Sequence, residues 1–301
     1  MSGQQPSPTG RSSCGRRDGA TGPAAFRPCP SPLGYGRAVA EPWRYALLPR
    51  LGISPSARQV VREFLEVGIA AREATQVGRG GPIDPAGGPS DGRVPVIDGP
   101  PSISALDAGC GRVSALKPFR PRIGRLVGVD IHTPDPEILR RFDEFALVDV
   151  CAESEAFPEA AFDVILSSFT VEHLADARSA FKNFRRWLRP GGRLVLVTVN
   201  RRHPFVGAYL GLPSSLRSRF QRLIKASGAD AHPLIGSCND VERLRGALEE
   251  AGYSSIQTRT VGHLARAWGI RSITWALGLV GDVLAQPFPS RRSTIVIAAD
   301  A

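Results

Sequence analysis

Short apolar runs alternate with amphipathic stretches through the middle and the C-terminal part of this chain. The runs end at glycine, proline, polar or acidic residues, which is typical of buried strands. They fall at 103–108, 125–130, 145–150, 162–167, 193–199, 254–260 and 293–298. Apolar residues recur at helical spacing within 56–75, 135–143, 176–188 and 239–251. Strands that alternate with helices predict an α/β fold with a doubly wound, mostly parallel sheet.

The ends of the chain differ in composition from its centre. Gly, Pro, Ser and Arg dominate the first forty residues, which predicts disorder there. Ser56 and Gln59 have the spacing of a capping box at the start of a helix. The predicted organisation is a disordered segment at 1–40, a helical extension and Gly/Pro linker at 41–101, a sheet core at 102–200, a basic cap or lid insertion at 201–238, and the rest of the sheet with an apolar helical insertion at 239–301.

A glycine turn follows the first predicted strand. The segment Ala105–Gly111 reads ALDAGCG, and the next apolar run ends at Asp130. Glycines let a turn be tight and a ligand approach the backbone, while an acid at the end of the second strand can accept from both ribose hydroxyls. The pattern predicts a cofactor that contains a nucleoside. A tight turn without a ligand explains the glycines as well.

Charge and cysteine usage narrow the class of protein. The net charge is +10, but only 3 of the 38 basic residues are Lys, and no nucleic-acid motif accompanies them. Nucleic acid is therefore an unfavoured partner. The 5 cysteines are scattered, which fits a reducing compartment and predicts no metal site. No apolar run is long enough to span a membrane, so a cytoplasmic location is expected.

Five motifs in this order resemble the class I S-adenosylmethionine-dependent methyltransferases, in particular the type 11 group. They are LDAGCG at 106–111, GVD at 128–130, Asp149 after the third strand, FDVILSSFTVEHL at 162–174 and LRPGGRL at 188–194. The resemblance covers roughly residues 103–200, with a looser fit over 239–301. It implies a Rossmann-like sheet of seven strands with an antiparallel last strand, and S-adenosyl-L-methionine as the cofactor.

The resemblance also implies roles for individual residues. Asp107 would hold the methionine end of the cofactor, and Asp130 the ribose. Asp149 would accept from the adenine amino group. The implied cofactor site comprises Asp107, Gly109, Cys110, Gly111, Asp130, Ile131, Asp149, Val150, Ser167 and Phe169. Structural roles stay open for these residues: a buttress of the turn for Asp107, a helix cap for Asp130, a solvated strand end for Asp149, and strand-end packing for Ser167 and Phe169.

Methyl transfer needs a base only when the acceptor keeps a proton, because the sulfonium already activates the methyl group. His173 is the candidate base, since imidazole titrates near neutral pH, and Glu172 is the second. Both could instead cap or orient the following helix. His203, before Pro204, is a weaker candidate that could face the acceptor.

The chain departs from the family where its first crossover helix should run. Val113 stands where many relatives have a third glycine, and Pro118 and Pro121 interrupt the segment. Because proline breaks helix interiors, at most one short helical turn is expected there. The change could loosen the methionine pocket.

The acceptor is predicted only by class, as a small molecule or a lipid-linked molecule. Two segments bear on it, a basic amphipathic helix at 215–225 and an apolar stretch at 273–284. They could form a lid over the acceptor, contact an anionic membrane peripherally, or pack in the core. The leading function is a methyltransferase. The alternatives are a non-catalytic S-adenosylmethionine-binding or partner protein of the same fold, and a nicotinamide oxidoreductase, which Ser114 disfavours at the last glycine position of its fingerprint.

Overall fold

The computed structural model describes residues 42–77, 102–111, 114–152, 155–213, 215–217, 219–220, 238–268 and 272–301. The predicted disordered segment, the Gly/Pro linker, Val113 and most of the basic segment at 215–225 lie outside these residues. No helix within the described ranges is long and apolar enough to cross a bilayer.

The core is one sheet of seven strands in the order β3-β2-β1-β4-β5-β7-β6. All neighbouring pairs are parallel except those of β7, which runs antiparallel to both β5 and β6. The predicted fold class, including the antiparallel last strand, is confirmed. The strands are β1 (Ile103–Ala108), β2 (Ile123–Asp130), β3 (Glu144–Leu147), β4 (Phe162–Ser168), β5 (Leu188–Val199), β6 (Ser254–Val261) and β7 (Thr294–Asp300).

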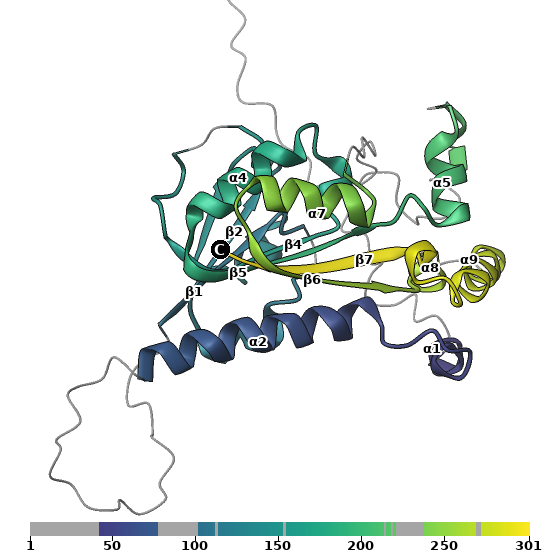
Figure 1. Ribbon diagram of the computed structural model, residues 1–301, viewed down its shortest axis with the longest axis horizontal. Coiled ribbons are helices and arrows are strands. Elements are labelled where there is room, and N and C mark those ends of the chain that lie inside the picture. The colour runs from purple at the N-terminus through teal and green to yellow at the C-terminus, as the bar shows by residue number, and fades with distance from the viewer. Residues whose placement is uncertain are drawn as a thin grey trace, which may run out of the picture. The chain divides into compact units, whose positions relative to one another are not determined.

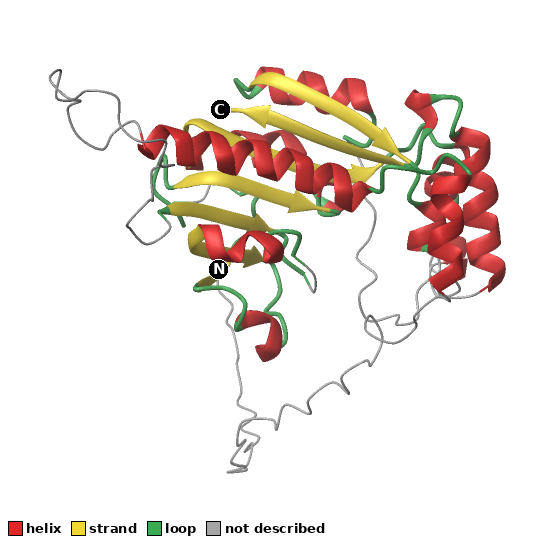
Figure 2. Cartoon of the chain, turned by 90° about the horizontal axis from the view of Figure 1, so that it is seen from below, coloured by secondary structure: helices red, strands yellow, loops and turns green. Residues whose placement is uncertain are grey.

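Helices cover both faces of the sheet, so its central strands are apolar on both sides (Figures 1 and 2). In β5, Leu194 and Leu196 pack into one core with α4 (Ala177–Trp187) and α7 (Val241–Glu250). Val195 and Val197 alternate with them and pack into the opposite core with α2 (Ala57–Val77). This alternation of faces follows from the period of two in a strand.

Three predicted elements differ in extent from those observed. The helix expected at 135–143 is only α3 (Pro136–Leu139), because the chain then turns so that Phe142 packs over Gly128 of β2. The third strand ends at Leu147, which leaves Asp149 in the following loop. The expected turn at 189–192 is a bulge within β5, where the pairing shifts from Phe162–Leu188 to Val164–Arg193.

The first crossover contains no α-helix within its described residues. It is the 3-10 helix η1 (Lys117–Arg122), which begins next to Pro118 and buries Phe119. At most one short helical turn was expected from the two prolines; the six residues of η1 make about two turns of 3-10 helix, so the segment is somewhat more helical than expected. Phe119 and Leu116 pack in the same core as α2, so this short helix still covers its side of the sheet.

A second group of helices lies beyond the ends of β5 and β6. It comprises α1 (Pro42–Arg50), α5 (Pro204–Gly211), α8 (Leu264–Ala267) and α9 (Ser272–Ala285), and it is followed by η4 (Pro289–Arg291). A Cβ added to Gly278 of α9 would lie 2.8 Å from the Leu264 carbonyl oxygen of α8. The lack of a side chain there lets the two helices approach closely.

Asp282 is the single charged residue of α9, and it holds this group together. Its side chain is buried and accepts hydrogen bonds from the Ala265 amide (2.9 Å) and the Ser293 hydroxyl (2.8 Å). The Ser293 oxygen in turn accepts from the amide of His263 (2.8 Å). Asp282 therefore fixes the start of α8 against the start of β7, and it gives α9 a buried polar anchor.

Helix starts follow the sequence signals. Ser56 and Gln59 form the predicted capping box, with the Ser56 amide donating to Gln59 Oε1 at 2.8 Å. Asp240 caps α7, and its side chain accepts from the Arg243 amide at 2.9 Å.

We expect Asp240→Ala to lower the free energy of unfolding by about 1 kcal/mol, because an orphan amide of α7 loses its acceptor. Urea denaturation measures the difference. The matched control is Asp135→Ala, since Asp135 precedes α3 but makes no side-chain cap bond. Equal losses from the two substitutions would contradict the capping role.

Candidate functional site

The site candidates gather where the parallel strands end. The carboxyl ends of β1, β2, β4, β5 and β6 lie at one edge of the sheet, because these strands all run in the same direction. Ligands of open α/β sheets bind at this edge. The turns after β1, β2 and β4 carry the residues that the motifs single out.

The turn after β1 is held on β2. The amides of Gly109 and Cys110 both donate to the Val129 carbonyl, at 2.8 and 3.1 Å. Gly109 and Gly111 have φ of +71° and +43°, a region that favours glycine. An added Cβ on Gly111 would meet only the Gly109 carbonyl oxygen at 3.8 Å, so that side of the turn has room for a ligand among the described atoms.

Gly109 is approached by a side chain that the motifs did not single out. An added Cβ on Gly109 would lie 2.2 Å from Thr170 Oγ1. Thr170 follows Phe169, whose φ of +55° turns the chain after β4 toward the glycine turn. The requirement for glycine at 109 is therefore a contact between the two turns. Thr170 lies inside the fourth-strand motif at 162–174, but the sequence alone indicated no role for it there.

Asp107 is buried, and its surroundings suit a cation. Its Oδ2 atom has no hydrogen-bond partner among the described residues, while Ser114 bonds to the carboxyl group. Burial raises the pKa of Asp107 to about 7; the hydrogen bond from Ser114 opposes the rise and the charge of Asp130 adds to it. An orphaned carboxylate oxygen at the strand end fits the ammonium of an amino-acid ligand.

Asp130 is tied to the backbone through both oxygens. Oδ2 accepts from the Gly111 amide at 3.3 Å, and Oδ1 accepts from the His132 amide at 3.1 Å. These bonds fix the carboxylate beside the glycine turn, and each oxygen keeps a lone pair for a ribose hydroxyl. Ile131, next to it, is 59% exposed.

The residues expected near the adenine lie in the loop after β3. Asp149 is exposed, and its Oδ1 accepts from the Cys151 amide at 2.9 Å. Val150 is buried, and its carbonyl accepts from Asn183 of α4 at 3.0 Å. The loop is therefore anchored to α4, and it holds the exposed Asp149 carboxylate at this edge of the sheet.

Cys110 is not suited to nucleophilic chemistry. Its side chain is buried, and burial raises the pKa of the thiol to about 12, with the charges of Asp107 and Asp130 acting in the same direction. A thiol that stays protonated is a poor nucleophile. Its role is packing beneath the glycine turn.

The turn after β4 carries the predicted acceptor-side residues. Ser167 is buried, and within the described structure its hydroxyl has no partner. Glu172 is buried in η2 (Val171–His173) and accepts from the Thr198 hydroxyl at 2.7 Å, which ties this turn to β5. His173 is half-buried beside it.

His203 has a structural role instead of facing an acceptor as a base. His203 is buried, and its Nδ1 accepts from the amides of Phe205 and Val206, so it caps α5. Burial lowers its pKa. The weaker expectation that His203 faces the acceptor is replaced by this structural role.

His263 was missed by sequence reasoning, because it belongs to no motif. Its ring stacks on Phe169 with the centroids 5.4 Å apart, and its Nδ1 is buried without a partner in the described residues. Burial, followed by the charges of Arg266 and Arg58, lowers the pKa of His263 to about 4. The ring is therefore neutral near pH 7 and can take part in a hydrogen bond at this edge.

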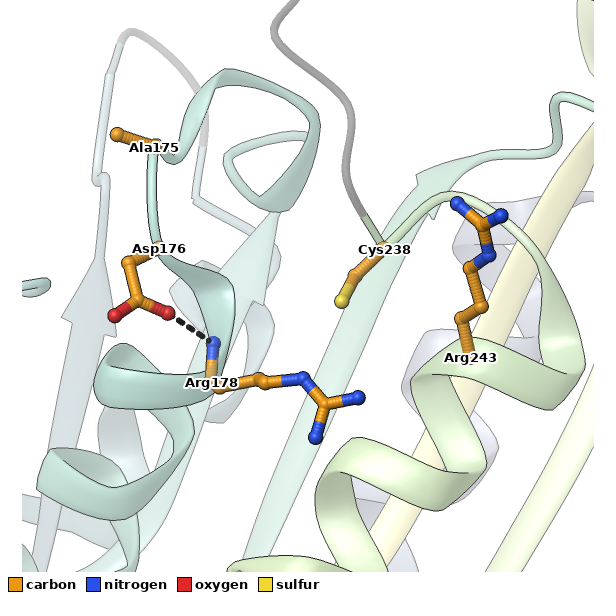
Figure 3. A pocket seen from close by; sticks show the side chains of 5 residues that line it. All are labelled: Ala175, Asp176, Arg178, Cys238 and Arg243. Carbon is orange, nitrogen blue, oxygen red and sulfur yellow. Dashed lines mark hydrogen bonds between the residues drawn. The ribbon is translucent and has the colours of Figure 1, made fainter.

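A hollow of about 400 Å³ lies between the starts of α4 and α7 (Figure 3). Its lining combines polar and apolar side chains: Ala175, Asp176, Arg178, Cys238 and Arg243. Asp176 caps α4, with its carboxylate accepting from the Arg178 amide at 3.1 Å. Among the described residues no three His, Cys, Asp or Glu side chains converge on a point that could hold a metal ion.

Comparisons with known proteins agree with the motifs. A family model described as a methyltransferase domain matches residues 90–258, more than half of the chain. Phosphoethanolamine N-methyltransferase 1 of Zea mays is 32% identical over 113 residues, which are 38% of this chain and 19% of that protein. The C-methyltransferase UbiE of Vibrio vulnificus (strain YJ016), named for ubiquinone and menaquinone biosynthesis, is 29% identical over 114 residues, 36% of this chain and 44% of that protein.

A solved structure of geranyl diphosphate C-methyltransferase from Streptomyces coelicolor A3(2), holding S-adenosyl-L-homocysteine, aligns with a TM-score of 0.46 and 19% identity. The alignment covers 66% of this chain and 70% of that one. The chain spans about a fifth of the length of the phosphoethanolamine methyltransferases that it matches. The resemblance seen in the motifs is confirmed by the family match: this chain belongs to the methyltransferase domain family.

Proposed function

We propose that this protein transfers a methyl group from S-adenosyl-L-methionine to a small-molecule or lipid-linked acceptor. One observation carries the proposal. Among the described residues, no group bonds to one carboxylate oxygen of the buried Asp107, and Asp130 is fixed beside the same glycine turn by the Gly111 amide. An amino acid joined to a nucleoside presents an ammonium and a ribose, which are the groups that these two acids suit.

The chain's own residues would hold the cofactor from its two ends. Asp107 would accept from the ammonium, Asp130 from the ribose hydroxyls and Asp149 from the adenine amino group. Cys110, Gly111, Ile131, Val150, Ser167 and Phe169 would line the site, and Gly109 would shape its turn. When bound, the cofactor supplies a methyl group already activated by the sulfonium, so the protein's contribution is alignment and exclusion of water.

On the acceptor side, His173 remains our candidate base. It lies one residue after Glu172, whose buried carboxylate bonds to Thr198 and thereby orients η2. We propose that Glu172 acts by positioning His173. His263 is a second neutral imidazole at the same edge, stacked on Phe169.

The acceptor class follows from relatives rather than from this chain. Their names point to phosphoethanolamine and to quinone precursors, which are a small molecule and lipid-like molecules. For this protein we propose the broader class that includes both. Peripheral contact with a membrane is a finer part of the proposal, and only its second predicted segment, 273–284, lies fully in the described structure.

Calorimetry with S-adenosyl-L-homocysteine tests cofactor binding. We expect Asp130→Asn to weaken binding about 30-fold, since hydrogen bonds to a charged acceptor are worth roughly 1.5–3 kcal/mol. Asp135→Asn is the matched control, because it removes the same charge from the loop that follows β2 and makes no side-chain cap bond.

Absence of heat from a folded wild-type sample, or equal binding by the two variants, would overturn the proposed cofactor site. Release of S-adenosyl-L-homocysteine from S-adenosyl-L-methionine with candidate acceptors then separates the enzyme from a binding protein of the same fold. Binding without turnover on phosphoethanolamine, quinone precursors and prenyl diphosphates would favour the non-catalytic alternative.

A further inference from the structure

One face of α9 is apolar and exposed. Ile273, Leu277, Val280 and Leu284 follow one another at spacings of four, three and four residues, so they form a single stripe along the helix. Their exposed fractions are 68%, 44%, 50% and 63%. The opposite side of α9 packs on α5 and α8 and holds the buried Asp282. Contacts with the described residues therefore do not account for the stripe, and exposed apolar stripes of this kind mark interaction surfaces.

Helix α1 extends this surface, although it is far away in sequence. Trp43 lies against Trp275 of α9 with the ring centroids 5.7 Å apart, and the Arg44 guanidinium covers the Trp275 ring at 5.2 Å. At the other end, Gln286 donates to the Gly52 carbonyl. The two helices thus run side by side, as Figure 2 shows at the right. Trp43, Leu51 and Phe288 add exposed apolar area at its borders.

The exposed charges of the two segments that form this α1–α9 face, 42–56 and 272–292, have one sign. Within 42–56 and 272–292, all of which the structure describes, the single acid is the buried Asp282. The basic residues of these two ranges are Arg44, Arg50, Arg291 and Arg292. Arg291 lies over the Phe288 ring at 5.6 Å, so a cation stands directly beside an exposed aromatic side chain. An apolar stripe with a basic border complements a surface that is apolar inside and anionic outside.

We propose that the α1–α9 face docks on the surface of a bilayer that contains anionic phospholipids. The stripe on α9 would enter the boundary between headgroups and acyl chains. Arg50 and Arg291, the two exposed arginines of this face, would pair with lipid phosphates. Arg292 is instead bonded to the Gln286 and Thr260 carbonyls. A second copy of this chain is a poorer occupant. A two-fold pairing would bring the same arginines together with no exposed acid in these two ranges to neutralise them, because Asp282 is buried. The docking does not depend on the proposed reaction.

The docking surface and the candidate site belong to the same part of the fold. Helix α8 begins directly after His263, which stacks on Phe169 at the end of β4, and α9 packs on α8. A membrane-bound protein would therefore receive acceptors close to the lipid surface. This consequence, unlike the docking, rests on the proposed function.

Sedimentation of the full-length protein with vesicles, without cofactor, tests the proposal. We compare vesicles of phosphatidylcholine mixed with phosphatidylglycerol against pure phosphatidylcholine, at low salt. Val280→Glu should lower the partition coefficient on anionic vesicles about tenfold or more, since it places a charge in the inserted stripe. Val67→Glu is the matched control: Val67 is 51% exposed on α2, and the same substitution there should change little.

Two double variants test the contribution of the arginines to vesicle binding separately from insertion of the apolar stripe. Arg50→Glu with Arg291→Glu should lower anionic-vesicle binding about tenfold or more, because each basic residue near the surface contributes roughly 1 kcal/mol. Arg62→Glu with Lys182→Glu changes the net charge equally on α2 and α4, and should have a much smaller effect. Circular dichroism checks folding, and Leu277→Glu replaces Val280→Glu if the latter does not fold.

Three results would overturn the proposal. The first is wild-type protein that stays in the supernatant with anionic vesicles at low salt. The second is equal binding by Val280→Glu and Val67→Glu. The third is a wild-type dimer in sedimentation velocity that Val280→Glu converts to a monomer, since the face would then be covered by a second copy.

Discussion

Gly109→Ala lowers the free energy of unfolding by about 3 kcal/mol or more, because two costs add at this position. A φ of +71° is unfavourable for a residue with a Cβ by roughly 1–2 kcal/mol. The new methyl group also lies 2.2 Å from Thr170 Oγ1 and 2.5 Å from Thr170 Cγ2, so the two turns must separate. Overpacking of this kind typically costs about 1–3 kcal/mol. Urea denaturation of the purified variant measures the sum.

Gly111→Ala is the control that isolates the backbone term. Gly111 also has a positive φ, but its added Cβ would meet only one atom, at 3.8 Å. We expect a loss of about 1 kcal/mol from this variant. Adding Thr170→Ala to Gly109→Ala removes the two nearest atoms and should restore part of the lost stability. Equal losses at 109 and 111, or no rescue by Thr170→Ala, would contradict the contact between the two turns.

The conformation of these two glycines could be predicted from the sequence, but the contact that Gly109 makes could not. Their positions after an apolar run predicted a tight turn, and the structure confirms positive φ at both. The partner of Gly109 could not be predicted, because Thr170 follows a different strand. Only the neighbouring positions of β1 and β4 in the sheet bring them together. Local backbone chemistry was visible in the sequence, whereas contacts across the sheet edge were not.

The same distinction explains the histidines. His173 was noticed because it lies inside a motif, and His203 because it precedes a proline. Their environments depend on packing, which the sequence does not show. His203 caps α5, and its ring lies close to Gly281 of α9. His263 has no local signal at all, and it reaches the site only because β6 runs parallel to β5. The fold could be predicted because each buried strand leaves a recognisable run of apolar residues in the sequence. Contacts between residues that are far apart in the sequence leave no such local pattern.

The apolar stretch at 273–284 illustrates an intermediate case. Its composition left three roles open, and its helical spacing alone could not choose among them. The structure buries one face through Gly278 and Asp282 and exposes the other. The neighbour that completes the surface, α1, comes from the opposite end of the chain. An amphipathic pattern thus predicts that one face is buried, but not which elements share the other.

Asp107 gives the largest effect on ligand affinity and makes that affinity depend on pH. With its pKa at about 7, the carboxyl is largely protonated at pH 6 in the unliganded protein. The ammonium of the cofactor requires the ionised form, so binding must first release this proton. We expect the affinity for S-adenosyl-L-homocysteine to fall about tenfold for each pH unit below 7. Calorimetry at pH 6, in buffers with different ionisation enthalpies, should detect release of close to one proton.

The Asp107 carboxyl also makes the free energy of unfolding of the unliganded protein depend on pH. Its folded pKa, about 7, lies above the ordinary value of 3.8. Between these two pH values the folded state therefore binds more protons than the unfolded state. The contribution of Asp107 to the free energy of unfolding is at its maximum below pH 4 and is lost as the pH rises to 7. At full burial the loss is on the order of 4 kcal/mol at most. Asp107→Asn should remove this dependence and make the unliganded protein more stable than the wild type at pH 8.

Asp107→Asn should also weaken cofactor binding at pH 8 by about 100-fold or more, because the bound ammonium would lose its charged partner. The variant separates two explanations of a pH effect. If Asp107 is the titrating group, affinity becomes nearly constant from pH 5.5 to 8 in the variant, whereas the control Asp135→Asn keeps the wild-type slope. Wild-type affinity that does not change over this range, or a variant that binds as tightly as the wild type, would show that the carboxylate does not face the cofactor. Asp107 would then be a buttress of the glycine turn, held by Ser114, and the ligand's ammonium would need a different acceptor at this edge.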